Sequence, residues 1–348
     1  VASQYRLRTR FPKAVEAEAE KHHAPGGAER RGRLDLRDQL AFTIDPEDAR
    51  DHDDALTVGR AGEGRWEVGI HIADVSHYVP AGSALDHEAE LRGTSVYLPG
   101  GVVPMLPERL SADLCSLRPD CDRLVLSVLV VLDGHGGLHG VRFEEAVIRS
   151  RHRLHYGEVQ EALEGRASLP AQLQEAIEAV MTLARALRAR RRKVGALDLE
   201  VPEVKVWVDE QGRPLRIERR AHLESHELIE EFMLLANRCV GGEGARRSSG
   251  LLYRVHDAPA ALKLAHLERM LRALGLPSPG DLSDPARALQ SVLRVPLDPA
   301  RRRLLHRLVL RSLARARYHA RDSGHFGLAT REYCHFTSPI RRYPDLHN

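Results

Sequence analysis

The strongest constraint on the fold of this chain is a change of hydrophobic period near residue 150. Between residues 41 and 148, β-branched and apolar residues form short runs separated by turn formers, a pattern typical of strands. Beyond residue 150, apolar residues recur at i, i+3, i+4 and i+7, which is typical of amphipathic helices. The sequence therefore predicts an α/β protein of the α+β type, with strands early and helices late.

The predicted elements follow from these two patterns. Strands are expected at 41–44, 55–58, 66–75, 124–132 and 141–148, and Asp133-Gly134 with Gly136-Gly137 is expected to close a hairpin between the last two. Helices are expected at 155–164, 170–192, 223–240, 259–274 and 299–321. A second hairpin is expected between 204–208 and 215–217, across Glu210-Gln211-Gly212.

The domain organisation is expected to be simple. Residues 1–40 are polar, with a helical pattern at 11–21 and a break at Pro25-Gly26-Gly27, and are predicted to be a linker. Residues 41–348 are then one catalytic domain, expected to be truncated at its C-terminal end. Because the chain begins with Val1, we expect it to be a fragment of a longer protein. No apolar run approaches the roughly 20 residues that cross a bilayer, so a cytoplasmic location without membrane contact is expected.

Charge and cysteine content leave several classes of partner open. The net charge is +3, and only five of the 52 basic residues are lysine. Arginine is the better phosphate ligand, although a biased genome produces the same excess. The four cysteines form no C-x-x-C pair, so neither zinc nor disulfides are expected.

One short segment concentrates the candidate chemistry. Residues 45–54 hold six acids, between the strands expected at 41–44 and 55–58. Such dense carboxylates repel one another unless cations neutralise them, and hard oxygen ligands select Mg²⁺ or Mn²⁺. A calcium loop does not fit, because Leu56 and Gly62 stand where its glycine and its final glutamate belong. A solvated acidic loop is the alternative, but Pro46 and the apolar flanks favour an inward-facing one.

The acidic segment resembles the central motif of the RNB family, which includes the exonucleases ribonuclease II and ribonuclease R. Thr43 to Ala55 matches the pattern T-I-D-x-x-x-A-x-D-x-D-D-A. Further blocks resemble the family in the expected order, at residues 71–78, 93–99, 104–108, 114–117, 228–231, 253–256 and 335–345. The resemblance implies the RNB catalytic fold, in which mixed β-sheets flanked by helices surround a narrow RNA channel.

The resemblance also implies an activity. The family hydrolyses single-stranded RNA processively from its 3′ end to 5′-monophosphates, using Mg²⁺ or Mn²⁺, with two ions expected. Asp45, Asp51, Asp53 and Asp54 match the four acids of the motif. Asp45 and Asp54 are expected to be direct ligands, while Asp51 and Asp53 serve a second ion or the attacking water.

Two arginines are candidates for handling phosphate. Arg341 matches the catalytic arginine of the family, and Arg342 is expected to bind backbone phosphate. Ser338 suits an N-cap and Pro339 a first helical position, so both arginines are predicted in a first helical turn. A helix N-terminus and a guanidinium would then meet at the scissile phosphate.

The remaining candidates concern the path of the RNA. Tyr97 and Tyr156 resemble tyrosines that stack on bases in the family, although a lone tyrosine is more often a core residue. Glu230 and Glu231 are candidates for contacts with the RNA backbone or ribose, with a plain helix surface as the alternative. Where relatives place an aromatic residue near 203–208, this chain has Val206 and Trp207.

Two other functions remain open from the sequence. A metal-dependent phosphohydrolase of short oligonucleotides would need the same acids but no long channel. A catalytically silent RNA-binding module would need the channel but not the acids. The expected partners are single-stranded RNA and flanking nucleic-acid-binding domains outside this chain.

Overall fold

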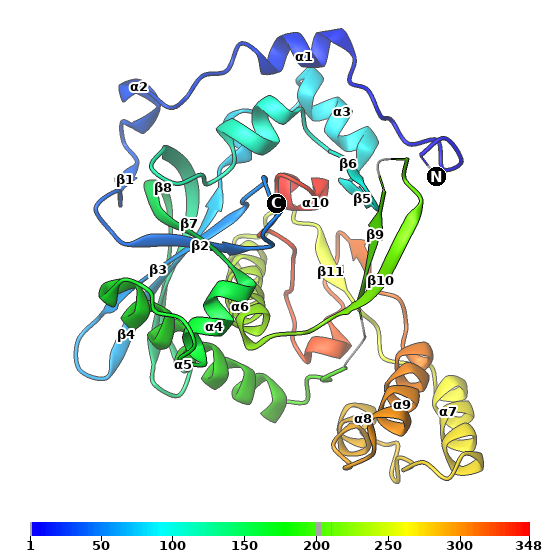
Figure 1. Cartoon of the computed structure of the whole chain (residues 1–348). Coiled ribbons are helices and arrows are strands. Elements are labelled where there is room, and N and C mark those ends of the chain that lie inside the picture. The colour runs from blue at the N-terminus through cyan, green and yellow to red at the C-terminus, as the bar shows by residue number, and fades with distance from the viewer. Residues whose placement is uncertain (1, 200–202, 210) are drawn as a thin grey trace.

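This computed structural model describes residues 2–199, 203–209 and 211–348 (Figure 1). Its strands are β1 Leu34–Asp35, β2 Ala41–Asp45, β3 Asp54–Arg60, β4 Arg65–Ala73, β5 Val96–Leu98, β6 Gly101–Val103, β7 Asp122–Asp133, β8 Leu138–His155, β9 Glu203–Val208, β10 Pro214–Arg220, β11 Tyr253–Val255 and β12 Arg317–His319. Its α-helices are α1 Lys13–Ala19, α2 Gly27–Arg30, α3 Ala84–Arg92, α4 Tyr156–Leu163, α5 Ala171–Lys193, α6 Glu224–Arg247, α7 Ala261–Ala273, α8 Pro285–Leu293, α9 Pro299–Ser312 and α10 Tyr343–His347.

The main sheet closes on itself through one long strand. Its order is β1-β8-β2-β3-β4-β7, and β7 also pairs with β8. The first part of β8 lies antiparallel to β7, and its last part lies parallel to β2. Because β2 ends at Asp45 and β3 begins at Asp54, the acidic loop lies at one end of this ring.

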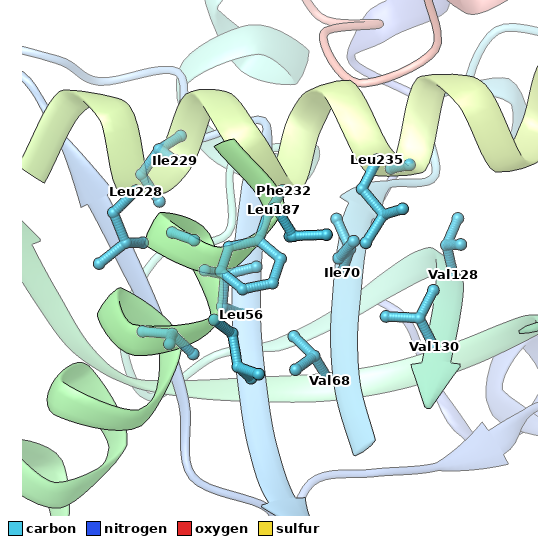
Figure 2. Packing of buried hydrophobic residues seen from close by; sticks show 14 of the residues in the cluster. Leu56, Val68, Ile70, Val128, Val130, Leu187, Leu228, Ile229, Phe232 and Leu235 are labelled. Carbon is cyan, nitrogen blue, oxygen red and sulfur yellow. The ribbon is translucent and has the colours of Figure 1, made fainter. Parts of the chain in front are cut away.

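The two faces of the main sheet pack into two different hydrophobic clusters. Along β3, Ala55 belongs to one buried cluster and Leu56 to the other, as the two-residue period of a strand requires. On the second face, α5 and α6 cover β3, β4 and β7, and Phe232 of α6 points toward Leu56 and Val68 (Figure 2). These helices hold the strands, and therefore the acidic loop, in place.

The early strands and most of the helices confirm the sequence-based prediction. The five predicted strands correspond to β2, β3, β4, β7 and β8, and the hairpin between the last two is present. The predicted helices at 155–164, 170–192, 223–240 and 259–274 correspond to α4, α5, α6 and α7. β9 and β10 pair as the second hairpin, in which Glu210 lies outside the described residues.

Three predictions about elements need correction. The helix expected at 299–321 ends at Ser312, because Leu313 is extended and the chain then forms β12 against β11. Helices α3 and α8 were not predicted, although Ser83 and Asp284 cap them in the usual way. Arg341 and Arg342, expected in a first helical turn after Ser338, instead precede α10, which begins at Tyr343.

The segment before residue 41 packs against the rest of the chain. Helix α1 confirms the helical pattern seen in the sequence, and its Val15 and Ala19 are buried in a cluster shared with α3. β1 pairs in parallel with β8.

Helices α7, α8 and α9 form a small unit with its own apolar cluster (Figure 1). Among the described residues, no helix is long and apolar enough to cross a membrane.

Candidate active site

The loop between β2 and β3 is fixed by its backbone. The amide of His52 donates to Ser116 Oγ (3.1 Å), and that hydroxyl donates to the carbonyl of Arg50 (2.8 Å). The carbonyl of His52 accepts from the amide of Leu117, and that of Asp53 accepts from Ala73. The second half of the loop is therefore fastened to neighbouring segments without using its carboxylates.

Asp53 meets the distant C-terminal segment. Its side chain is buried, at 4% exposure, and its Oδ1 accepts a 2.9 Å hydrogen bond from the amide of Ile340, 287 residues away. The Nε of Arg341 lies 3.7 Å from the other oxygen of Asp53. The structure thus brings together two residues that the sequence singled out separately.

The C-terminal segment reaches Asp53 as a turn and not as a helix. The carbonyl of Arg341 accepts from the amide of Ser95 (2.9 Å) and from Thr94 Oγ1 (2.8 Å). Arg342 has an extended backbone and forms a bridge with Thr94, so α10 begins only at Tyr343. The prediction that both arginines lie in a first helical turn is therefore wrong.

Ser338 has a different role from the predicted N-cap. Its hydroxyl accepts a 3.0 Å hydrogen bond from Nη2 of Arg341. Its amide donates to Oδ1 of the buried Asp345 at 2.9 Å. Ser338 therefore orients the guanidinium of Arg341 toward the acids.

Burial makes two of the acids costly to ionise. Burial raises the pKa of Asp53 well above its usual range, and the attraction of Arg341 offsets this only in part. Burial, followed by the nearby charge of Asp45, also raises the pKa of Asp54. Asp54 keeps part of its surface exposed, whereas Asp53 is buried. A bound cation would remove the cost of ionising both groups.

The ligand atoms at this site are of the type that a hard divalent cation prefers. All four acids offer carboxylate oxygens, which Mg²⁺ and Mn²⁺ prefer. Among the described residues, however, no three His, Cys, Asp or Glu side chains converge as a ready-made metal-binding group. An ion here would have to draw the carboxylates together around itself.

The two other acids each have one polar partner. Oδ2 of Asp45 lies 2.8 Å from Nδ1 of the buried His52, and Oδ2 of Asp51 accepts from the hydroxyl of Tyr97 at 2.9 Å. Tyr97 as a residue is 54% exposed, so part of it remains accessible beside the acids. His52 was missed by sequence reasoning; its position between two motif aspartates was the only available signal.

The remaining predicted residues have other partners in the structure. Tyr156 stacks on His226, with ring centroids 4.1 Å apart. Arg342 pairs with the buried Asp345. Glu231 is buried and pairs with Arg191 of α5, whereas Glu230 is exposed. Arg342 also lies close enough to Asp53 for the charge of that acid to act on its guanidinium.

The β9–β10 hairpin approaches the acidic loop on one face. Lys205 Nζ lies 3.4 Å from Oδ2 of Asp48 and 4.4 Å from the ring centre of Trp207. Trp207 Nε1 donates to Glu218, and its ring is 41% exposed. Val206 lies opposite Ile217 in the strand register. Because side chains alternate along a strand, Trp207 and not Val206 shares the face of Lys205.

The chain is similar in sequence to known proteins. A model of the RNB domain matches residues 33–348. Ribonuclease R of Thermotoga maritima is 45% identical over 90% of this chain and 45% of its own length, and ribonuclease R of Escherichia coli is 40% identical over 97% and 42%. The chain spans about half the length of the curated relatives it matches.

A solved structure gives the same result. Mycoplasma genitalium RNase R in complex with ribose-methylated single-stranded RNA superposes with a TM-score of 0.93 at 32% identity, over 99% of this chain and 54% of the other. The sequence match and the structural match therefore agree over nearly the whole chain. The chain belongs to the RNB domain family.

Proposed function

We propose that this chain carries the catalytic centre of a hydrolytic exoribonuclease that degrades single-stranded RNA processively from its 3′ end to 5′-monophosphates. The observation that carries the proposal is the meeting of Asp53 with Ile340 and Arg341, beside three further aspartates. Its relatives named ribonuclease R, one of them seen with single-stranded RNA, support the choice of substrate.

The proposed cofactor is a pair of Mg²⁺ ions, replaceable by Mn²⁺, held by Asp45, Asp51, Asp53 and Asp54. When bound, such ions activate the attacking water and stabilise the leaving oxygen. The chain itself supplies the orientation of these groups. His52 fixes one oxygen of Asp45, and Tyr97 fixes one of Asp51.

Arg341 is proposed to stabilise the charge that develops on the scissile phosphate. Its side chain is 42% exposed and anchored at Nη2 by Ser338, so it stands at the edge of the acids. A guanidinium presents a planar fork of donors that matches phosphate oxygens. The exposed ring of Tyr97 is proposed to stack on a base, and Arg342, Tyr156, Glu230 and Glu231 stay candidates for contacts further along the RNA.

The whole protein is proposed to extend beyond this chain. Residues 41–348 would form the catalytic domain and residues 1–40 would lead into it. Flanking nucleic-acid-binding domains are proposed because the relatives are about twice as long. We propose a cytoplasmic location.

A gel of end-labelled RNA tests the function directly. With Mg²⁺, 5′-labelled single strands should convert to a short end product with few intermediates, and 3′-labelled strands should release labelled mononucleotide at once. With a chelator, both should stay intact. Rates that do not depend on RNA length beyond a dinucleotide would favour the phosphohydrolase instead. RNA that is bound but never cleaved would favour the silent binding module.

Divalent ions should stabilise the protein in a pH-dependent way. The raised pKa values of Asp53 and Asp54 mean that the metal-free fold loses stability as pH rises from the usual aspartate range through the folded pKa. An ion that binds the ionised acids reverses this loss, and at 100 times its Kd it contributes about 2.7 kcal/mol. Calorimetry should therefore show a larger rise in Tm with Mn²⁺ at pH 8 than at pH 5.5.

A matched pair of variants controls the Mn²⁺ experiment. Asp54→Asn should abolish most of the rise in Tm. Asp48→Asn should retain it, because the Asp48 side chain is 74% exposed and contacts Lys205. An equal rise at both pH values, or in both variants, would refute binding at the buried acids.

Two substitutions at Tyr97 should separate its two contacts. Tyr97→Phe removes the hydrogen bond to Asp51 but keeps the ring, so KM for RNA should stay near wild type. Tyr97→Ala also removes the ring, and losing a stacked base costs about 1–3 kcal/mol, which should raise KM roughly 5- to 150-fold. Steady-state kinetics on an unstructured oligoribonucleotide would measure both. Equal KM values for the two variants would exclude stacking by Tyr97.

A further inference from the structure

The first half of the acidic loop is held by a single arginine of β8. Nη2 of Arg153 donates to the carbonyl of Glu47 at 2.7 Å and to the carbonyl of Ala49 at 3.1 Å. Between these carbonyls the loop turns, with the amide of Ala49 bonded to the carbonyl of Pro46 at 3.0 Å. Arg153 therefore braces a turn that a backbone hydrogen bond closes at residues 46–49.

The sheet register explains how Arg153 reaches the loop. The end of β8 runs parallel to β2, and Arg153 lies opposite Thr43, two residues before β2 ends at Asp45. The guanidinium therefore lies beside the chain as it leaves the strand. Within the described part of the chain, Arg153 has no carboxylate at ion-pair distance, so its charge is directed to backbone carbonyls.

The two halves of the loop have separate anchors. Arg153 fixes the half that follows Asp45, and Ser116 fixes the half that contains Arg50 and His52. The carbonyl of Arg50 is held by Ser116, but the side chain of Arg50 is 80% exposed. The pairing of β2 with β3 places Asp45 and Asp54, and these anchors, with the contact between His52 and Asp45, hold the chain between them.

We propose that Arg153 is a positioning residue that fixes the path of the loop from Asp45 to Asp51 before a metal ion binds. The inference rests on the proposed metal chemistry of this site. Because the carboxylates of the described residues do not yet converge, ion binding must draw them together. A loop that is already held in one conformation loses less conformational entropy in this step, so the ion binds more tightly. Arg153 acts through the backbone, and it touches neither an ion nor RNA.

Mn²⁺ titration of metal-free protein, followed by electron paramagnetic resonance of the free ion, tests this role. Arg153→Met should raise the Mn²⁺ concentration for half-saturation by on the order of ten-fold, as losses of groups behind metal ligands do. Arg153→Lys, which can still donate to a carbonyl, should lie between wild type and Arg153→Met. Arg151→Met is the matched control, because Arg151 lies two residues earlier on β8 and contacts Arg37 and Asp120 instead. It should bind Mn²⁺ like wild type.

A second readout needs no metal and no activity. Trypsin should cut metal-free Arg153→Met after Arg50 several times faster than wild type or Arg151→Met, as measured by mass spectrometry of the fragments. Far-ultraviolet circular dichroism shows whether each variant is folded. If Arg153→Met is unfolded, the trypsin rate and the Mn²⁺ affinity of Arg153→Lys are compared with those of wild type instead.

The possible outcomes separate the two proposals. Wild-type protein that binds no Mn²⁺ would overturn the proposed metal chemistry and the role of Arg153 with it. If wild-type protein binds Mn²⁺, and Arg153→Met shows the same Mn²⁺ affinity and the same rate of trypsin cleavage as wild type, only the role of Arg153 would be overturned.

Discussion

Asp53→Asn is expected to lower kcat for RNA degradation by at least about 1000-fold while leaving RNA affinity near wild type. The substituted amide keeps an oxygen that can accept from the amide of Ile340, so the local backbone should not move. It loses the negative charge that would bind an ion and attract Arg341. Steady-state degradation of a labelled oligoribonucleotide in excess measures kcat, and filter binding measures affinity.

The same substitution should stabilise the metal-free protein at high pH. Since burial raises the pKa of Asp53, ionisation of this group costs stability as pH rises above the usual aspartate range. Asp53→Asn removes that cost, so its Tm should exceed that of wild type at pH 8, with little difference at low pH. A variant that is both inactive and less stable at pH 8 would show that its inactivity comes from misfolding. Asp48→Asn, from the exposed part of the loop, should remain active.

The sequence predicted the acids and Arg341 because each lies in a short, ordered motif. Asp45 and Asp54 are bracketed by strands whose apolar pattern is clear, so their position at one end of the sheet follows from local residues. The contact between Asp53 and Arg341 could be expected only from the family resemblance. No periodicity in the sequence indicates that segments so far apart meet.

Other features depended on tertiary contacts that the sequence does not encode locally. The strand β8 was predicted, but not that it pairs with β7 and β2 at once and closes the ring. The helical sequence after Ser312 gives way to β12 because pairing with β11 outweighs local propensity. Only the family resemblance distinguishes Arg341 from Arg342 in the sequence, whereas in the structure Arg341 faces Asp53 and Arg342 pairs with the buried Asp345.

Replacement of Arg341 should reveal whether this arginine acts on the substrate or on Asp53. Arg341→Ala is expected to lower kcat by about 1000-fold, in the range seen when a charge-stabilising donor at a transferred phosphate is lost. Arg341→Lys should recover only part of this, because an ammonium group lacks the planar fork. Arg331→Ala, an exposed arginine of the same segment, is the control and should retain activity.

The dependence on pH and on Mn²⁺ separates the two explanations. Arg341 lowers the pKa of Asp53, so removing it raises that pKa further and shifts ion binding to higher pH. If this were its whole effect, high pH and saturating Mn²⁺ would restore kcat in Arg341→Ala. We expect no more than a small recovery, because a guanidinium aimed at the phosphate contributes most when charge develops on the phosphate oxygens. Full recovery at pH 9 in excess Mn²⁺ would mean that Arg341 serves Asp53 and not the RNA.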